Sequence, residues 1–274
     1  MYASSGDYAI YYETAGDAAG RPLLLVSGLG GQCISWPAEF VRMLVDVGFM
    51  VICFDNRDVG LSTKSPEGAS YLLGDMACDA VAVLDALDID AVHLCGSSMG
   101  AMIAQTIAIE HPDRVASLTS ISSNAAFGAG GGATPEALAA LMEPAPIDRE
   151  GNIERAARTS HALGGPHVDD ALVRAQAALA YDRCFDPKGA ELQFLAAAGS
   201  PDRTEGLRGL AMPTTVIHGR IDPLIPLAAG EAVADAITDA KLVILDENGH
   251  DFAPTFWPIY VAELVAVADR ADAT

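Results

Sequence analysis

Gly96-Ser97-Ser98-Met99-Gly100 is the stretch of sequence that decides the fold. The apolar run Val92-His93-Leu94-Cys95 before it predicts a β-strand, and residues 99–110 after it have the pattern of a helix. A G-x-S-x-G between strand and helix is typical of a nucleophile elbow, a sharp turn that lifts a serine hydroxyl clear of a sheet. Glycine is needed two residues before and after the serine, because a Cβ there would clash with the strand and helix. The spacing therefore selects Ser98, rather than Ser97, as a nucleophile.

Other short apolar runs have the same form and predict further strands. They lie at residues 23–26, 50–54, 115–121, 214–217 and 242–245. Uninterrupted apolar runs are typical of parallel strands that are covered on both faces. Helical patterns alternate with them at residues 38–47, 75–87, 99–110, 227–237 and 258–268. This alternation predicts an α/β fold, a mostly parallel doubly wound sheet, and the alternating run of residues 8–12 predicts an antiparallel edge strand.

Residues 124–213 break this rhythm and predict a helical cap inserted between two core strands. The insertion opens with the glycine-rich residues 127–132, and alanine-rich helical patterns follow at residues 135–142, 152–162, 169–181 and 188–198. The core domain then comprises residues 1–123 and 214–274. A cap over the carboxyl edge of the sheet would cover the place where α/β proteins bind ligands; an ordinary helical subdomain is the alternative. Because alanine buries little area, we expect a mobile lid.

Composition excludes several classes of function. The chain has 274 residues, 51% of them hydrophobic, and a formal net charge of −21, so nucleic acid and anionic membranes are poor partners. We find no signal peptide and no apolar run long enough to span a bilayer. The five cysteines lack the spacing of a disulfide framework or a metal site, so we expect no metal and a cytoplasmic protein.

A serine nucleophile needs a base, and His250 is the best-placed of six histidines. It follows the last predicted strand, where the chain order Ser…Asp…His puts the base. The acid that orients the imidazole is predicted to be Asp222, on the loop after the preceding strand. Asp246 is the alternative acid, but it lies too close to His250 in sequence to face its ring easily. Asp251, next to the histidine, points elsewhere in most loop conformations.

Two backbone N–H groups must stabilise the oxyanion that forms during attack on a carbonyl. Met99, directly after the nucleophile, supplies one of them. The other is expected in the glycine-rich segment 27–31, with Leu29 as first choice and Gly30 next. A phosphate cradle is the alternative for this segment, but it lacks both G-x-G-x-x-G and the lysine of a P-loop.

The sequence resembles the α/β-hydrolase superfamily over nearly the whole chain outside the cap. The matching segments are residues 27–31, 55–62, 96–100, 111–114, 218–223 and 249–250. Residues 36–40, which begin with Trp36, and the run Asn56-Arg57-Asp58 resemble the branch that contains aclacinomycin methylesterase. Two departures bear on the pocket: Ser27-Gly28 stands where His-Gly is common, and Asp58 stands where glycine is usual.

These observations predict a serine hydrolase that cleaves a carboxylic ester of a small, fairly apolar substrate and needs no cofactor. Besides the catalytic and oxyanion residues, we expect substrate contacts from six residues: Gly28, Gly30, Trp36, Leu138, Leu141 and Met142. A lactonase, a carbon–carbon bond hydrolase and a cofactor-free perhydrolase are alternatives that use the same residues. A non-catalytic ligand receptor on this scaffold is an alternative of another class. The expected partner is a small-molecule ester, and the sequence does not decide between a monomer and a homodimer.

Overall fold

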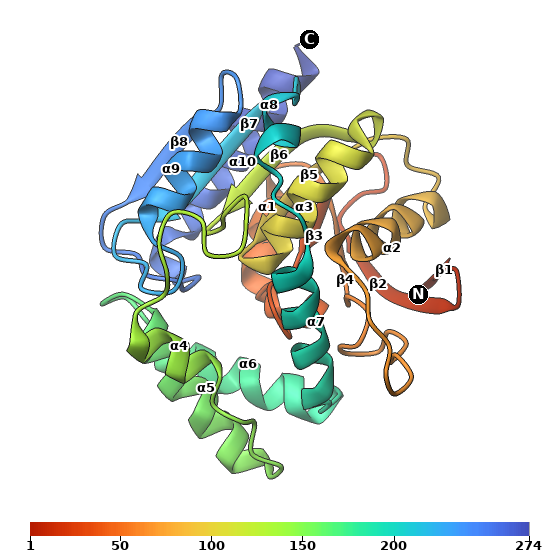
Figure 1. Ribbon diagram of the computed structural model, residues 1–274. Helices are drawn as coiled ribbons and strands as arrows, with labels where there is room; N and C mark the ends of the chain where they lie inside the picture. The colour runs from red at the N-terminus through yellow and green to blue at the C-terminus, as the bar shows by residue number, and fades with distance from the viewer. Residues whose placement is uncertain (274) are drawn as a thin grey trace.

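The computed structural model describes residues 1–273 and contains one eight-stranded sheet with the order β1-β2-β4-β3-β5-β6-β7-β8 (Figure 1). The strands are β1 (Tyr2–Ser5), β2 (Tyr8–Ala15), β3 (Arg21–Val26), β4 (Phe49–Phe54), β5 (Val92–Ser97), β6 (Val115–Ile121), β7 (Thr214–Gly219) and β8 (Lys241–Leu245). All neighbouring pairs from β4 to β8 are parallel. The predicted doubly wound α/β sheet is therefore confirmed.

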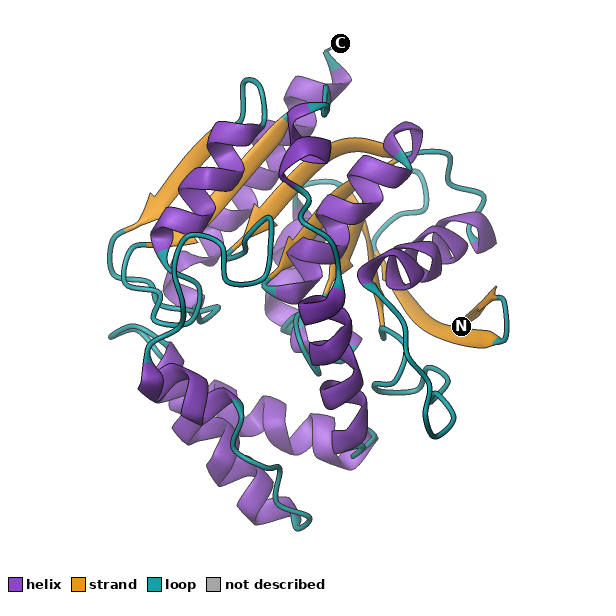
Figure 2. Cartoon of the chain, viewed as in Figure 1, coloured by secondary structure: helices purple, strands orange, loops and turns teal. Residues whose placement is uncertain are grey.

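Helices cover both faces of the sheet (Figure 2). In this view α2 (Leu73–Ala86), α3 (Met99–Glu110) and α9 (Leu227–Ala236) lie in front, and α1 (Ala38–Asp46) and α10 (Trp257–Asp272) lie behind. Each face has its own hydrophobic core, and the alternation along a strand assigns side chains to one or the other. In β3, Leu24 and Val26 belong to one core and Leu23 and Leu25 to the other. This burial on both faces explains the uninterrupted apolar runs in the sequence.

The N-terminal end of the sheet differs from the prediction. The strand expected at residues 8–12 is the longer β2, and it is not at the edge, because β1 pairs with it on one side and β4 on the other, both antiparallel. A turn at Gly6, whose φ is 56°, joins β1 to β2. The sequence does not predict strand β1, because its four residues, two of them serine, carry too little apolar pattern to indicate a strand.

Five helices lie between β6 and β7. They are α4 (Pro135–Leu141), α5 (Arg149–Leu163), α6 (Asp170–Arg183), α7 (Pro187–Gly199) and α8 (Thr204–Arg208). The strand arrows point toward α4 to α7, which form an arch at the carboxyl edge of the sheet (Figure 2). The last helix, α8, instead packs against α3 and α9 of the sheet domain. We use the word cap below for α4 to α7.

Among the described residues, none of the helices combines the length and the hydrophobicity needed to cross a lipid bilayer.

Candidate active site

The turn between β5 and α3 puts Ser98 in a backbone conformation that residues with a side chain rarely adopt, with φ 57° and ψ −125°. The flanking glycines are required by close contacts. A Cβ at Gly96 would lie 2.2 Å from the carbonyl oxygen of Gly100, and one at Gly100 would lie 2.1 Å from that of Val26. The N–H of Ser98 donates to the carbonyl of Ile121 at 2.9 Å, which ties the turn to β6.

Three predicted residues form a continuous row of hydrogen bonds. Ser98 Oγ lies 2.9 Å from His250 Nε2, and His250 Nδ1 lies 2.6 Å from Asp222 Oδ2. His250 and Asp222 have side chains only 8% and 0% exposed, so water competes little for this second bond. With Asp222 ionised, Nδ1–H donates to the carboxylate and Nε2 is free to accept the proton of Ser98 Oγ.

The loop after β7 holds the carboxylate of Asp222 rigidly. Its Oδ1 accepts hydrogen bonds from the N–H groups of Leu224 and Ile225, at 2.9 and 2.8 Å, which leaves Oδ2 for His250. The alternative acid, Asp246, is instead paired with Arg220 at the surface, at 2.7 Å. Asp246 therefore plays no part in the row of hydrogen bonds.

Beneath this row, His218 is fully buried. Its Nε2–H donates to the carbonyl of Ile225 at 2.8 Å, and Nδ1 has no partner among the described residues. Burial lowers the pKa of His218, although the nearby Asp222 opposes that effect. A neutral His218 leaves the charge of Asp222 available to His250.

The glycine-rich loop after β3 lies against the nucleophile. A Cβ at Gly28 would lie 3.3 Å from Ser98 Cβ, so the backbone of this loop approaches the reacting oxygen closely. The N–H of Gly30 already donates to Gln193 Oε1 of α7, at 2.9 Å. Gly30 is therefore not free to bind an oxyanion, and of the two candidates in this loop Leu29 remains. Met99 begins α3, whose first N–H groups have no partner within the helix.

Ser98 lines an apolar cavity of about 310 Å³ between the sheet and the cap. The lining residues are Leu29, Ser98, Met99, Met102, Asn124, Phe127, Gly128, Gly131, Gly132, Ala133, Leu138, Leu141, Phe194, Ala197, Leu224 and Ile225. Leu138 and Leu141, predicted to face the substrate, are among them. Phe194 of α7 and Phe127 were missed, because the sequence does not show which faces of the cap helices meet the core.

Four of the six predicted substrate contacts lie outside the lining of this cavity: Gly28, Gly30, Met142 and Trp36. Gly28 lies against Ser98 but does not line the cavity, and Gly30 is bonded to Gln193. Met142 lies just after α4 and is 55% exposed.

Trp36 also lies away from the cavity that contains Ser98. It is buried in the core behind the sheet, where its ring stacks on Phe40 with centroids 6.0 Å apart. Its aromatic character is therefore used in packing.

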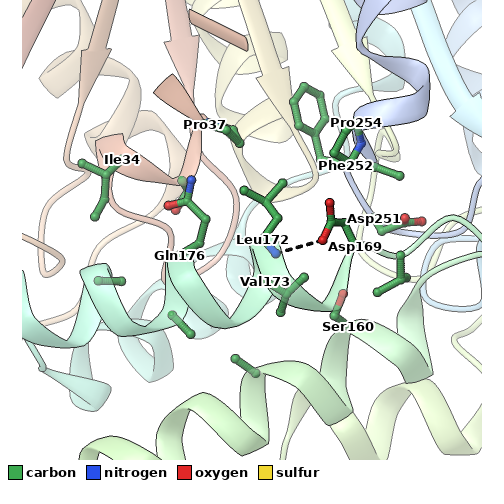
Figure 3. A pocket seen from close by; sticks show the side chains of 16 residues that line it. Ile34, Pro37, Ser160, Asp169, Leu172, Val173, Gln176, Asp251, Phe252 and Pro254 are labelled. Carbon is green, nitrogen blue, oxygen red and sulfur yellow. Dashed lines mark hydrogen bonds between the residues drawn. The ribbon is translucent and has the colours of Figure 1, made fainter. Parts of the chain in front are cut away.

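A second cavity, of about 300 Å³, lies on another side of the cap (Figure 3). Its walls are α5, α6 and core residues at positions 34, 35, 37 and 251–254, and Ser98 does not line it. Asp169 at its centre caps α6 through the N–H of Leu172, at 3.0 Å (Figure 3).

Two histidines of the inserted segment, His161 and His167, are engaged at the surface. His161 and His167 pair with Asp170 and Glu247 at the surface. In residues 1–273 we find no group of three His, Cys, Asp or Glu side chains arranged to hold a metal ion.

Known proteins resemble this chain in both sequence and fold. Residues 21–255 match the family described as alpha/beta hydrolase fold, and the chain belongs to this family. Rhodomycin D methylesterase DauP of Streptomyces sp. (strain C5) is 29% identical over 96% of this chain and 94% of its own length. A 2-hydroxymuconate semialdehyde hydrolase of Pseudomonas sp. (strain CF600) is 32% identical over 92% and 89%, respectively. Among solved structures, esterase RhEst1 from Rhodococcus sp. ECU1013 superposes with a TM-score of 0.81, at 23% identity and 98% coverage of each chain.

The structure explains one of the two departures from the family pattern, Asp58, and leaves the other, Ser27, unexplained. Asp58, where glycine is usual, has φ 72°, a conformation that glycine adopts freely and aspartate tolerates. Its carboxylate accepts hydrogen bonds from the N–H and hydroxyl of Ser65, which stabilises this backbone. Ser27, where histidine is common, is buried and its hydroxyl donates to the carbonyl of Gln32 at 3.2 Å. Nothing in the structure explains the choice of serine there.

Proposed function

We propose that this protein is a serine hydrolase that cleaves a carboxylic ester through an acyl-enzyme intermediate. The observation that carries the proposal is the hydrogen-bonded row of Ser98, His250 and Asp222, which ends in an apolar cavity. A hydroxyl bonded to an imidazole, itself oriented by a buried carboxylate, is the arrangement that activates serine as a nucleophile. The relatives named as methylesterase and esterase support the choice of an ester as substrate.

The reaction proceeds in two halves. Ser98 Oγ attacks the ester carbonyl carbon while His250 Nε2 takes the hydroxyl proton, and the N–H groups of Leu29 and Met99 stabilise the resulting oxyanion. His250 then gives this proton to the leaving alcohol as the carbon–oxygen bond breaks, which leaves the acyl group on Ser98. In the second half, water attacks the acyl carbon, His250 takes a proton from it and returns it to Ser98 Oγ, and the free acid departs.

The cavity supports a small and mostly apolar substrate. Leucine, methionine, phenylalanine and alanine side chains dominate its lining, and about 310 Å³ is the size of a small-molecule site. Its polar side chains are Ser98 and Asn124. Asn124 is 5% exposed and its Oδ1 has no hydrogen-bond partner among the described residues. An unpaired buried amide oxygen is costly, so a hydroxyl of the substrate is the donor that we propose for Asn124 Oδ1.

Turnover of p-nitrophenyl esters of graded chain length, compared between wild type and Ser98→Ala, tests the proposal. We expect the wild type to prefer medium acyl chains, and Ser98→Ala to lose on the order of 10⁴–10⁶ in kcat while unfolding at the same temperature. Mass spectrometry should detect the acyl group on Ser98 during turnover. Equal activity of the folded variant would exclude Ser98 as the nucleophile, and ligand binding without any turnover would favour a receptor.

A further inference from the structure

The loop that carries His250 is in direct backbone contact with the cap. The N–H of His250 donates to the carbonyl of Leu163, the last residue of α5, at 2.7 Å. Across the same contact, a Cβ at Gly249 would lie 2.5 Å from that carbonyl oxygen, and one at Gly165 would lie 2.3 Å from the carbonyl oxygen of Glu247. The glycines thus let residues 163–165 of the cap and residues 247–251 of the core approach to van der Waals distance.

Asp251 joins the two segments through one carboxylate oxygen. Its Oδ1 accepts hydrogen bonds from the N–H of Gly165 in the cap and from the N–H of Gly249 in the loop, both at 3.1 Å. The other oxygen, Oδ2, is buried and has no partner among the described residues. Asp251 lies at one end of the second cavity, on the side of the loop that includes Phe252 and Pro254 (Figure 3). It does not contact Ser98 or line the cavity that contains it.

We infer that Asp251 is a positioning residue, and that it uses the cap to hold the imidazole of His250 in line with Ser98. This inference rests on the proposed function, because it assigns Asp251 a role in the activation of Ser98. The physical reason is that His250 lies on a loop, where a small displacement of the backbone lengthens the bond from Nε2 to Ser98 Oγ. The cap offers this loop an acceptor, the carbonyl of Leu163, to which His250 N–H donates. It also offers a donor, the N–H of Gly165, and Asp251 Oδ1 accepts from this N–H and from that of Gly249. The cap therefore supports catalysis as well as covering the substrate.

Variants on both sides of the contact test this inference. Asp251→Ala removes the acceptor, Asp251→Asn keeps an oxygen in its place, and Gly165→Ala separates the cap from the loop. The matched controls are Asp246→Ala, which removes a surface carboxylate a few residues away, and Gly199→Ala, whose added Cβ would lie 3.4 Å from its nearest neighbour. Besides ester turnover, the rate of inactivation by diisopropyl fluorophosphate is measured, because this small probe reports the activation of Ser98 without depending on the binding of an acyl chain.

We expect Asp251→Ala and Gly165→Ala to lower kcat and the inactivation rate together, by about 10- to 100-fold, with KM little changed. Asp251→Asn and both controls should stay close to wild type. If Asp251→Ala does not unfold cooperatively on heating, Gly165→Ala and Asp251→Asn decide the question. The inference is overturned if folded Asp251→Ala and Gly165→Ala are inactivated at the wild-type rate, if only KM changes, or if Asp251→Asn loses as much as Asp251→Ala. A wild type that does not react with the probe would instead contradict the proposed function.

Discussion

Ser98 has a backbone conformation that costs on the order of 1–3 kcal/mol for a residue with a side chain, and the glycines on either side are what make it attainable. The strain aims the hydroxyl at His250 instead of leaving it to cap α3, to which it makes no hydrogen bond. Motif and strand context together were enough to select this serine from the sequence, because the steric requirement at the turn is local.

The acid is the member of the site whose assignment depends most on the fold. We expect Asp222→Asn to lower kcat by up to ~10⁴, because an amide in this place favours the wrong tautomer of His250. The hydrogen bonds from Leu224 and Ile225 to Oδ1 should hold the asparagine in the same position, so KM and the thermal unfolding temperature should change little. Steady-state kinetics and circular dichroism of the purified variant check this.

Asp246→Asn is the control for that experiment. Its carboxylate pairs with Arg220 on the surface, and exposed pairs of this kind contribute about 0–1 kcal/mol to stability. A large loss of kcat in Asp246→Asn, with Asp222→Asn fully active, would contradict the assignment of the acid.

Other residues of the site could not be read from the sequence. Two neighbouring residues of α7 belong to this group. Gln193 accepts a hydrogen bond from the N–H of Gly30, and Phe194 lines the cavity. Which of them faces the loop and which faces the cavity depends on how α7 lies on the core. Nothing in an alanine-rich helical pattern specifies that rotation, whereas the position of Ser98 or His250 at a strand end specifies theirs.

At the scale of elements, the α/β alternation predicted the strands and helices of the core well, because each apolar run is buried on both faces. Helix α3 begins at Met99 and ends at Glu110, as predicted. The cap helices were also recognisable, yet their attachment was not. Their alanine-rich composition predicts weak contact with the core, but α6 and α7 are attached by buried polar contacts as well as by apolar ones.

Arg183 near the end of α6 is the centre of one attachment. It pairs with the fully buried Asp55 at 2.8 Å and donates to Gln32 Oε1 at 2.7 Å. Gln32 in turn donates to the carbonyls of Ala180 and Cys184. In α7, Gln193 Nε2 donates to the carbonyl of Arg57 at 2.8 Å. These contacts confine any lid movement to the part of the cap that lacks them.

We therefore predict that movement is concentrated in residues 127–142, which comprise the glycine-rich loop and α4. Gly128 has open space around it, and Leu138 of α4 is 46% exposed. Hydrogen exchange should be fast in this segment and slower in α6 and α7 by orders of magnitude, because their anchors must break before they open. Mass-spectrometric exchange on the free protein measures this, with β3 as the protected reference. Uniform exchange across residues 127–199 would show that the whole cap moves as one body.

At the scale of the whole molecule, burial of histidines makes stability depend on pH. The formal net charge of −21 makes polyanions poor partners in the sequence analysis, but it does not reveal which titratable groups are buried. The structure shows His93, the second residue of β5, 4% exposed, with Nδ1 2.9 Å from Ser117 Oγ. Its position in an apolar run is typical of a core residue, and its contacts agree.

Burial lowers the pKa of His93, although Asp272, 3.8 Å away, opposes this effect. An unfolded histidine has a pKa of about 6.5, so between that value and the lowered one the unfolded chain binds the extra proton. Stability is then complete above pH ~6.5 and falls as the pH drops, by up to ~1.4 kcal/mol per pH unit for this one group. His218, whose pKa burial also lowers, adds a slope of the same sign.

His93→Gln isolates this contribution, because it removes one titrating group far from Ser98 and keeps a side chain that can bond Ser117. We predict that the variant is less stable than wild type at pH 8 and that the difference shrinks as the pH falls to 5, since only the wild type must exclude a proton from the site. Urea unfolding at pH 5, 6, 7 and 8 gives the free energy of unfolding for both proteins. Two parallel curves would mean that His93 has the same pKa in the folded and in the unfolded chain, which would contradict the lowered pKa.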